Sequence, residues 1–159
     1  ETAGGIANAL PLLTDSSRTQ PFAVINADIF CDMDCFALHP ILQQMQSNSG
    51  HTLAHLILVE NPPHHPEGDF FLNSNTGRLT ESVTTGCQKL TFSGIGVYHP
   101  ALFENIPPDQ AVKLAPLLRQ AIAAGKASGS HYPGIWLDIG TPERLQQLDT
   151  TLKQSTLNI

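Results

Sequence analysis

Two aspartates that each end a short apolar run are the residues best suited to chemistry in this 159-residue chain. Asp28 ends residues 22–28, and Asp138 ends residues 134–138. If both runs are strands of an open α/β sheet, the carboxylates lie in the crevice where such sheets bind ligands. Mg²⁺ takes one or two carboxylates and completes its shell with water and substrate phosphates. The pair could therefore hold a metal that neutralises charge during displacement at phosphorus.

The spacing of these aspartates also fits a simpler role. An apolar strand followed by Asp is a common pattern, and no local motif joins the two positions. On spacing alone, the favoured interpretation is that each carboxylate merely caps a turn. The elements around the two positions must decide between a cap and a ligand.

Apolar patterning predicts an α/β chain. Residues 22–28 and 52–60 are apolar runs of the kind found in strands covered on both faces. A helix that begins near Asp32 or Asp34 and ends at about Ser47 joins them, so the two strands should be parallel in a right-handed βαβ unit. The other predicted helices are 4–13, 100–105, 114–124 and one from 141, and the other predicted strands are 69–72, 78–81, 90–99, 126–132 and 134–138.

Composition excludes some classes of protein. The net charge is −6 and only 14% of residues are charged, whereas a protein that binds duplex nucleic acid needs a basic face. The length suits a single domain over residues 1–159. No apolar run approaches a membrane span and no signal peptide is visible, so we expect a cytoplasmic protein without a membrane or nucleic-acid partner.

The three cysteines, Cys31, Cys35 and Cys87, do not have the spacing of a zinc site, and free thiols in a reducing cytoplasm are expected. The chain opens on Glu1 rather than on Met. We therefore expect that it starts within a longer sequence or has been cut.

The loop at residues 61–68 carries three prolines and the pair His64 and His65. Zinc is disfavoured because adjacent side chains point in different directions and no third ligand is near in sequence. A solvated pair is predicted, on a loop that either covers a substrate or is a surface excursion. His55 is predicted to be a satisfied core or edge histidine, and Trp136 to pack beside the site.

Six segments, taken in order, resemble the sugar-1-phosphate nucleotidylyltransferases. They are residues 1–6, 24–28, 61–70, 90–95, 113–118 and 136–144. The mannose-1-phosphate guanylyltransferase-related and N-acetylmuramate-1-phosphate uridylyltransferase members are the most similar. The resemblance implies a Rossmann-like mixed, mostly parallel sheet flanked by helices, which is the nucleotide-diphospho-sugar transferase fold. It also implies that a sugar 1-phosphate attacks the α-phosphate of a nucleoside triphosphate, UTP or GTP, and that pyrophosphate leaves.

The same resemblance implies roles for individual residues. Asp28 and Asp138 match the family's catalytic aspartates, which hold Mg²⁺. Nucleotide binding is implied for Thr2, Ala3, Gly4 and Gly5, and sugar-phosphate binding for Asn26, Glu67, Ser93, Gly94 and Thr141.

Two departures from the family pattern qualify these expectations. Ala27 stands where the family usually has Gly before the first aspartate. The family's N-terminal Gly-x-Gly-x-Arg-Met loop and its Lys-Pro pair have no counterpart, so the domain is expected to be N-terminally truncated. We expect the isolated chain to be inactive, because cationic charge stabilisation dominates phosphoryl transfer. The alternative is a non-catalytic binding remnant, or one that self-associates through an exposed sheet edge.

Overall fold

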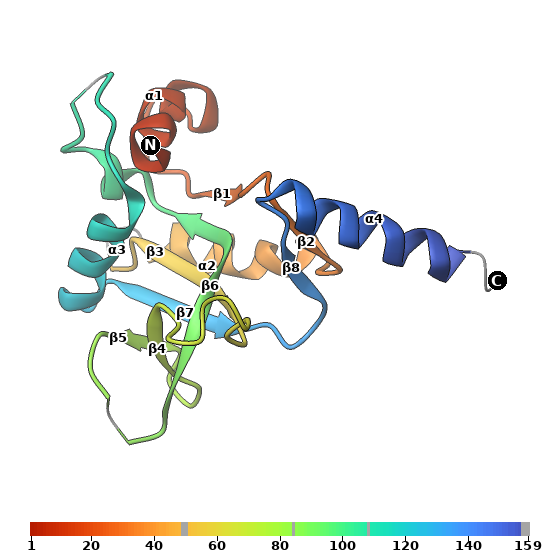
Figure 1. The fold of residues 1–159 in the computed structure, drawn as a ribbon. Helices are drawn as coiled ribbons and strands as arrows, with labels where there is room; N and C mark the ends of the chain where they lie inside the picture. The colour runs from red at the N-terminus through yellow and green to blue at the C-terminus, as the bar shows by residue number, and fades with distance from the viewer. Residues whose placement is uncertain (49–50, 84, 108, 157–159) are drawn as a thin grey trace.

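The computed structural model describes residues 1–48, 51–83, 85–107 and 109–156. Within these residues, four α-helices and two short 3₁₀ helices surround a six-stranded sheet and a separate two-stranded sheet, as Figure 1 shows in outline. In spatial order the large sheet comprises β1 (Phe22–Ile25), β6 (Cys87–Tyr98), β3 (Ala54–Val59), β7 (Ala127–His131), β5 (Arg78–Thr80) and β4 (Phe70–Asn73). The small sheet pairs β2 (Ile29–Cys31) with β8 (Trp136–Asp138). The helices are α1 (Thr2–Leu13), η1 (Cys35–Leu38), α2 (His39–Ser47), η2 (Pro100–Phe103), α3 (Leu114–Ala123) and α4 (Pro142–Thr156).

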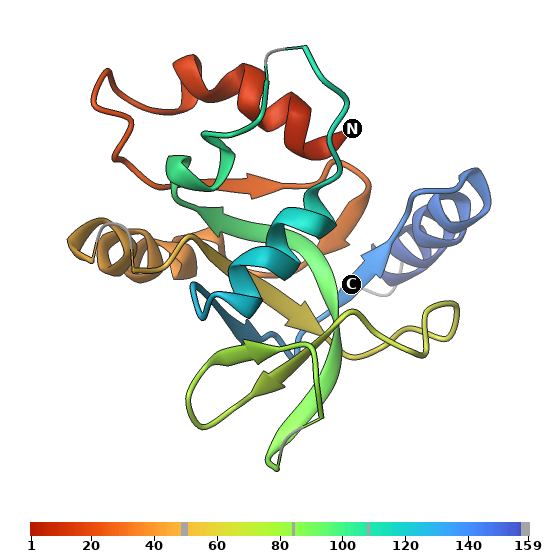
Figure 2. The same cartoon turned by 90° about the vertical axis from the view of Figure 1, so that its left-hand side faces the viewer.

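Strand β3 is buried on both faces, as its apolar run predicted. Leu56 and Leu58 belong to one core cluster, which α1, η2 and α3 complete. Ile57 belongs to a second cluster, to which η1 and α2 contribute Leu38 and Met45. The sheet therefore lies between two layers of helix, and α1 and α3 cover the same face of it (Figure 2).

The mixed α/β architecture is confirmed, with a difference in how the strands pair. β1 and β3 both pair with β6 in an antiparallel sense, so they run parallel to each other but β6 lies between them. The one parallel pairing among the described strands joins β3 to β7. The sheet is thus mixed but mostly antiparallel, because the long strand β6 enters between the two strands of the expected βαβ unit.

A bulge in β6 shapes the region that faces the site. The β3–β6 register shifts between Leu56 and Leu58, and Gly94 on β6 has a φ of +82°. A side chain disfavours this left-handed backbone, which explains the glycine. A Cβ at Gly94 would also lie 3.0 Å from the side chain of Asn26. The bulge therefore brings β6 close to the end of β1.

Helix α4 extends away from the sheet (Figure 1). Thr141 caps its start, since the Thr141 hydroxyl accepts a hydrogen bond from Arg144 N at 3.3 Å. Within the described residues, no helix combines the length and the apolar character that a bilayer crossing requires.

Candidate active site

The small β2–β8 sheet brings the two aspartates together. Ile29 lies opposite Asp138 in its antiparallel register, and Asp28 O accepts a hydrogen bond from Ile139 N at 2.9 Å. Asp138 is the last residue of β8, as expected, but Asp28 lies just before β2 rather than at the end of β1. The shared crevice is therefore built by an antiparallel pairing of two distant segments, outside the large sheet.

Both carboxylates approach one point beside Gly140. A Cβ added at Gly140 would lie 3.1 Å from Asp138 Oδ1 and 3.4 Å from Asp28 Oδ2. Glycine leaves this space free, so the two carboxylates face a cradle that any side chain at this position would enter. Asp138 does cap its own turn, because Gly140 N donates to its Oδ1, but the approach of Asp28 to the same point is more than two independent caps require.

Two hydrogen-bond donors and one histidine surround the carboxylate of Asp138. Gly140 N donates to Oδ1 at 2.9 Å, and Arg144 Nη1 donates to Oδ2 at 2.7 Å. His64 Nε2 lies 3.3 Å from the same Oδ2. The Gly140 hydrogen bond and the charges of Arg144 and His64 together hold the pKa of Asp138 below its ordinary value, against an opposing effect of burial. Asp138 is thus ionised at neutral pH.

A third aspartate, Asp32, fixes the position of the small sheet. The Asp32 carboxylate accepts hydrogen bonds from the Tyr132 hydroxyl and from Ile135 N. The Tyr132 hydrogen bond, as the main cause, lowers the pKa of Asp32, and the same bond raises the pKa of Tyr132 to about 12. This brace ties the end of β2 to the segment before β8. Asp32 therefore positions the site, while Asp34 caps η1 through Phe36 N.

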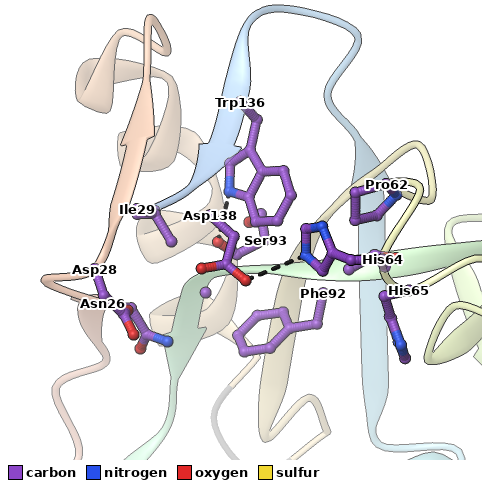
Figure 3. A pocket seen from close by; sticks show the side chains of 12 residues that line it. Asn26, Asp28, Ile29, Pro62, His64, His65, Phe92, Ser93, Trp136 and Asp138 are labelled. Atoms are coloured by element: carbon purple, nitrogen blue, oxygen red, sulfur yellow. Dashed lines mark hydrogen bonds and ion pairs between the residues drawn. The ribbon is translucent and has the colours of Figure 1, made fainter. Parts of the chain in front are cut away.

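A cavity of about 330 Å³ opens beside the aspartates, within the size range of small-molecule sites. Of the residues with implied roles, Asn26, Asp28, Ser93, Gly94 and Asp138 line it (Figure 3). Trp136 forms part of its wall, beside the site as predicted, and donates from Nε1 to Ser93 O at 2.8 Å.

The hydroxyl of Ser93 is committed to the fold. Ser93 is fully buried, its Oγ donates to Ile57 O at 2.8 Å and accepts from Ile95 N at 3.2 Å. Its backbone carbonyl accepts a hydrogen bond from Trp136 Nε1. Any contribution of Ser93 to sugar binding would therefore come through the shape of the bulge rather than through its hydroxyl.

Of the four implied nucleotide-binding residues, only Thr2 lines a second cavity. This cavity, of about 310 Å³, is lined by Thr2 and shares Asn26 and Phe92 with the first one. Ala3 N and Gly4 N, however, both donate to Val112 O, at 3.0 and 3.2 Å. These two N–H groups are therefore used within the fold, so any nucleotide contact by residues 3 and 4 would come through other atoms.

Close packing explains why residue 4 is a glycine. A Cβ at Gly4 would lie 2.0 Å from Gln110 O, whereas one at Gly5 would meet nothing within 4 Å. Two further predicted residues lie outside the lining of the aspartate cavity: Glu67 is exposed, and Thr141 caps α4. Nucleotide binding by residues 2–5 and sugar binding by Glu67 and Thr141 stay predictions.

The proline-rich loop is held in a defined shape. Asn61 Nδ2 donates to Pro66 O and Lys89 O, each at 3.1 Å, and Asn61 Oδ1 accepts from Thr91 at 2.9 Å. Gly68 closes the loop with a φ of +59°, and a Cβ there would lie 2.5 Å from Asn61 Oδ1. The loop is therefore braced against β6 rather than being a loose surface excursion.

This brace directs the two histidines to different partners. His64 points at Asp138, whereas His65 points away from it (Figure 3) and pairs with Asp69 at 3.1 Å. His64 is exposed, as a solvated loop predicts, but it also lines the aspartate cavity. The unusual density of Pro and His in the loop was the signal in the sequence, but it carried no direction for the side chain.

Comparisons with known proteins give a consistent result. No family model matches the chain. It is 46% identical over 147 residues to the N-acetylmuramate alpha-1-phosphate uridylyltransferase of Neisseria meningitidis serogroup B, covering 92% of this chain and 60% of that protein. It is 26% identical over 148 residues to the mannose-1-phosphate guanyltransferase beta-B of Xenopus laevis, covering 89% and 38%. The chain is homologous to the sugar-1-phosphate nucleotidylyltransferases.

Solved structures support the fold of this nucleotidylyltransferase homologue. A UTP-bound UGPase from Acinetobacter baumannii superposes with a TM-score of 0.62 at 13% identity, covering 100% of this chain and 62% of that one. HddC from Yersinia pseudotuberculosis in complex with GMP-PN gives 0.60 at 19% identity, covering 92% and 60%. The chain thus spans about 60% of the length of these structures and of its Neisseria relative.

The two aspartate side chains of this site suit a hard divalent cation. Among the described residues, no group of three or more His, Cys, Asp and Glu side chains could hold a metal ion. A structural zinc site needs four such ligands and a catalytic zinc site needs three. Mg²⁺ can instead be coordinated by two carboxylates together with water and phosphate oxygens. The Gly140 cradle between Asp28 and Asp138 fits the second case.

Proposed function

We propose that the site transfers a nucleotidyl group from a nucleoside triphosphate to a sugar 1-phosphate, with Mg²⁺ and with release of pyrophosphate. The observation that carries the proposal is the convergence of the Asp28 and Asp138 carboxylates beside Gly140. The name of the 46%-identical relative makes N-acetylmuramate 1-phosphate and UTP the first substrates to test.

The residues of the chain have distinct tasks in this reaction. Asp28 and Asp138 would hold the metal, whose charge offsets the negative charge that develops on the phosphates. The hydrogen bonds from Gly140 N and Arg144 keep Asp138 ionised and fix its orientation. Trp136 and the β6 bulge form part of the cavity wall and would contact the sugar.

The test is product formation by the full-length protein. N-acetylmuramate 1-phosphate and glucose 1-phosphate would each be incubated with UTP, GTP or dTTP and Mg²⁺, and both pyrophosphate and nucleotide sugar would be quantified. We expect matched amounts of the two products, most with UTP and N-acetylmuramate 1-phosphate. Absence of pyrophosphate in every combination would reject the proposal.

Gly140→Ala should raise the Mg²⁺ requirement. The added methyl would lie 3.1 and 3.4 Å from the two carboxylate oxygens and would enter the space between them. We expect about a tenfold increase in the Mg²⁺ concentration for half-maximal rate, as for other changes that disturb the surroundings of metal ligands. The measurement is a Mg²⁺ titration of the rate at saturating substrates.

Gly5→Ala is the control for the added methyl alone, and at saturating nucleotide its Mg²⁺ requirement should equal that of the wild type even if its nucleotide affinity changes. A Cβ at Gly5 meets no atom within 4 Å, so its effect on folding should be small. A Mg²⁺ requirement that stays the same in Gly140→Ala would show that the metal does not occupy the cradle.

A further inference from the structure

The aspartate cavity is poor in positive charge. Among its described lining residues, only His64 and His65 can become cationic. Arg144 lines a neighbouring cavity of about 360 Å³ and reaches Asp138 from that side. A sugar 1-phosphate would bring its phosphate next to two carboxylates. A phosphate in this position would therefore be stabilised by a hydrogen-bond donor from the lining of the cavity.

Of the two histidines, His64 is free to serve as that donor. His64 Nε2 lies 3.3 Å from Asp138 Oδ2, at the edge of the cavity, and an imidazole nitrogen donates a hydrogen bond when it carries the ring proton. His65 Nε2 is instead engaged by Asp69, whose second oxygen accepts from Phe92 N at 2.8 Å.

His64 is also both accessible and fixed in place. Its side chain is 39% exposed, on the wall that the two cavities share. The Asn61 hydrogen bonds hold the loop that carries it, so little conformational entropy would be lost when a ligand binds. The Arg144 contact with Asp138 is much shorter, at 2.7 Å, than the His64 contact. Asp138 therefore keeps a strong partner if His64 turns to a ligand.

We propose that His64 is a substrate-binding residue whose Nε2–H donates a hydrogen bond to the phosphate of the sugar 1-phosphate. The proposal rests on the proposed function and deepens it by assigning the donor for the acceptor phosphate. It places the sugar phosphate between the braced loop and Asp138, in the cavity that His64 lines.

The test compares two probes that differ only in the phosphate. Affinities for N-acetylmuramate 1-phosphate and for N-acetylmuramate would be measured by calorimetry with the full-length protein, as wild type and as His64→Ala and His64→Gln. Loss of a hydrogen bond to a charged group should weaken binding of the phosphorylated probe about 10- to 100-fold. Binding of the unphosphorylated probe should change little. Gln, whose amide can donate, should restore part of the difference.

A kinetic measurement with the same proteins gives a second result. His64→Ala should raise the KM for the sugar 1-phosphate and leave the KM for UTP nearly unchanged. His39→Ala, which removes an exposed histidine at the start of α2, is the control and should match the wild type in both assays.

The outcomes separate the two proposals. Equal weakening of both probes, or unchanged affinity for both, in His64→Ala would overturn the role of His64, even if the wild type forms nucleotide sugar. Failure of the wild type to form nucleotide sugar, with the phosphate-dependent loss still present in His64→Ala, would reject the proposed function and keep the phosphate contact.

Discussion

Replacing Asp28 or Asp138 with Asn should lower the rate of nucleotidyl transfer by about 10²- to 10³-fold or more, the usual effect of removing a group that stabilises transition-state charge. Asn keeps the size of the side chain but removes the negative charge that the proposed metal requires. Because both carboxylates approach the same point beside Gly140, either substitution alone should remove most of the activity. The measurement is kcat at saturating substrates over a range of Mg²⁺ concentrations.

The two substitutions carry different side effects. Asp138→Asn also weakens the pair with Arg144 and the contact with His64, so its folding must be checked by thermal unfolding. Asp28→Asn is the cleaner variant, because it leaves that cluster intact. Asp15→Asn, in the exposed turn after α1, is the matched control and should retain full activity. Unchanged turnover in Asp28→Asn would remove Asp28 from the site.

Acidification should destabilise the protein through His55. Burial lowers the pKa of His55 from 6.5 to about 4, so the unfolded chain binds a proton more readily than the folded one. The resulting stability is complete above pH 6.5 and is lost as the pH falls through the interval from 6.5 to 4. The expected loss is up to about 3 kcal/mol of unfolding free energy. Urea denaturation at several pH values between 7 and 4 measures it.

The surroundings of His55 make this an effect of burial. Its ring nitrogens hydrogen-bond to Ser128 Oγ at 2.8 Å and Ser130 Oγ at 3.1 Å on the neighbouring strand β7. The described side chains that line the small cavity beside it are uncharged. The neutral ring thus joins β3 to β7, as the prediction of a satisfied histidine required.

A variant of His55 isolates its contribution. His55→Gln should be less stable at pH 7 but should lose less stability on acidification, and His39→Gln should keep the full acid loss. Some loss should remain in His55→Gln, because burial also lowers the pKa of His99. An acid loss in His55→Gln equal to that of the wild type would contradict the assignment.

The sequence was most informative where burial determines structure. The apolar run of β3 correctly indicated two covered faces, and Thr141 correctly indicated the start of α4. The pairing of strands was less accessible, because apolar periodicity reports burial but not direction. β6 has the same apolar character whether it runs parallel or antiparallel, so its insertion between β1 and β3 could not be foreseen.

The sequence also identified some residues of the candidate site and missed others. Asp28 and Asp138 were identifiable as a pair only through the ordered motifs, because the three-residue strands that join them are too short to give a periodic signal. His64 was missed because its direction depends on Asn61, which bonds to Lys89 and Thr91 far along the chain. The close packing of Gly4 against Gln110 O could not be foreseen either, because the two residues lie far apart along the chain.

The position of the bound metal tests the central claim most directly. Crystals of the full-length protein would be grown with Mn²⁺ and N-acetylmuramate 1-phosphate, and the ion would be located by its anomalous scattering. The account predicts one peak at coordination distance, about 2.1 Å, from carboxylate oxygens of both Asp28 and Asp138, and no such peak in Asp28→Asn. A peak that contacts neither aspartate would contradict it.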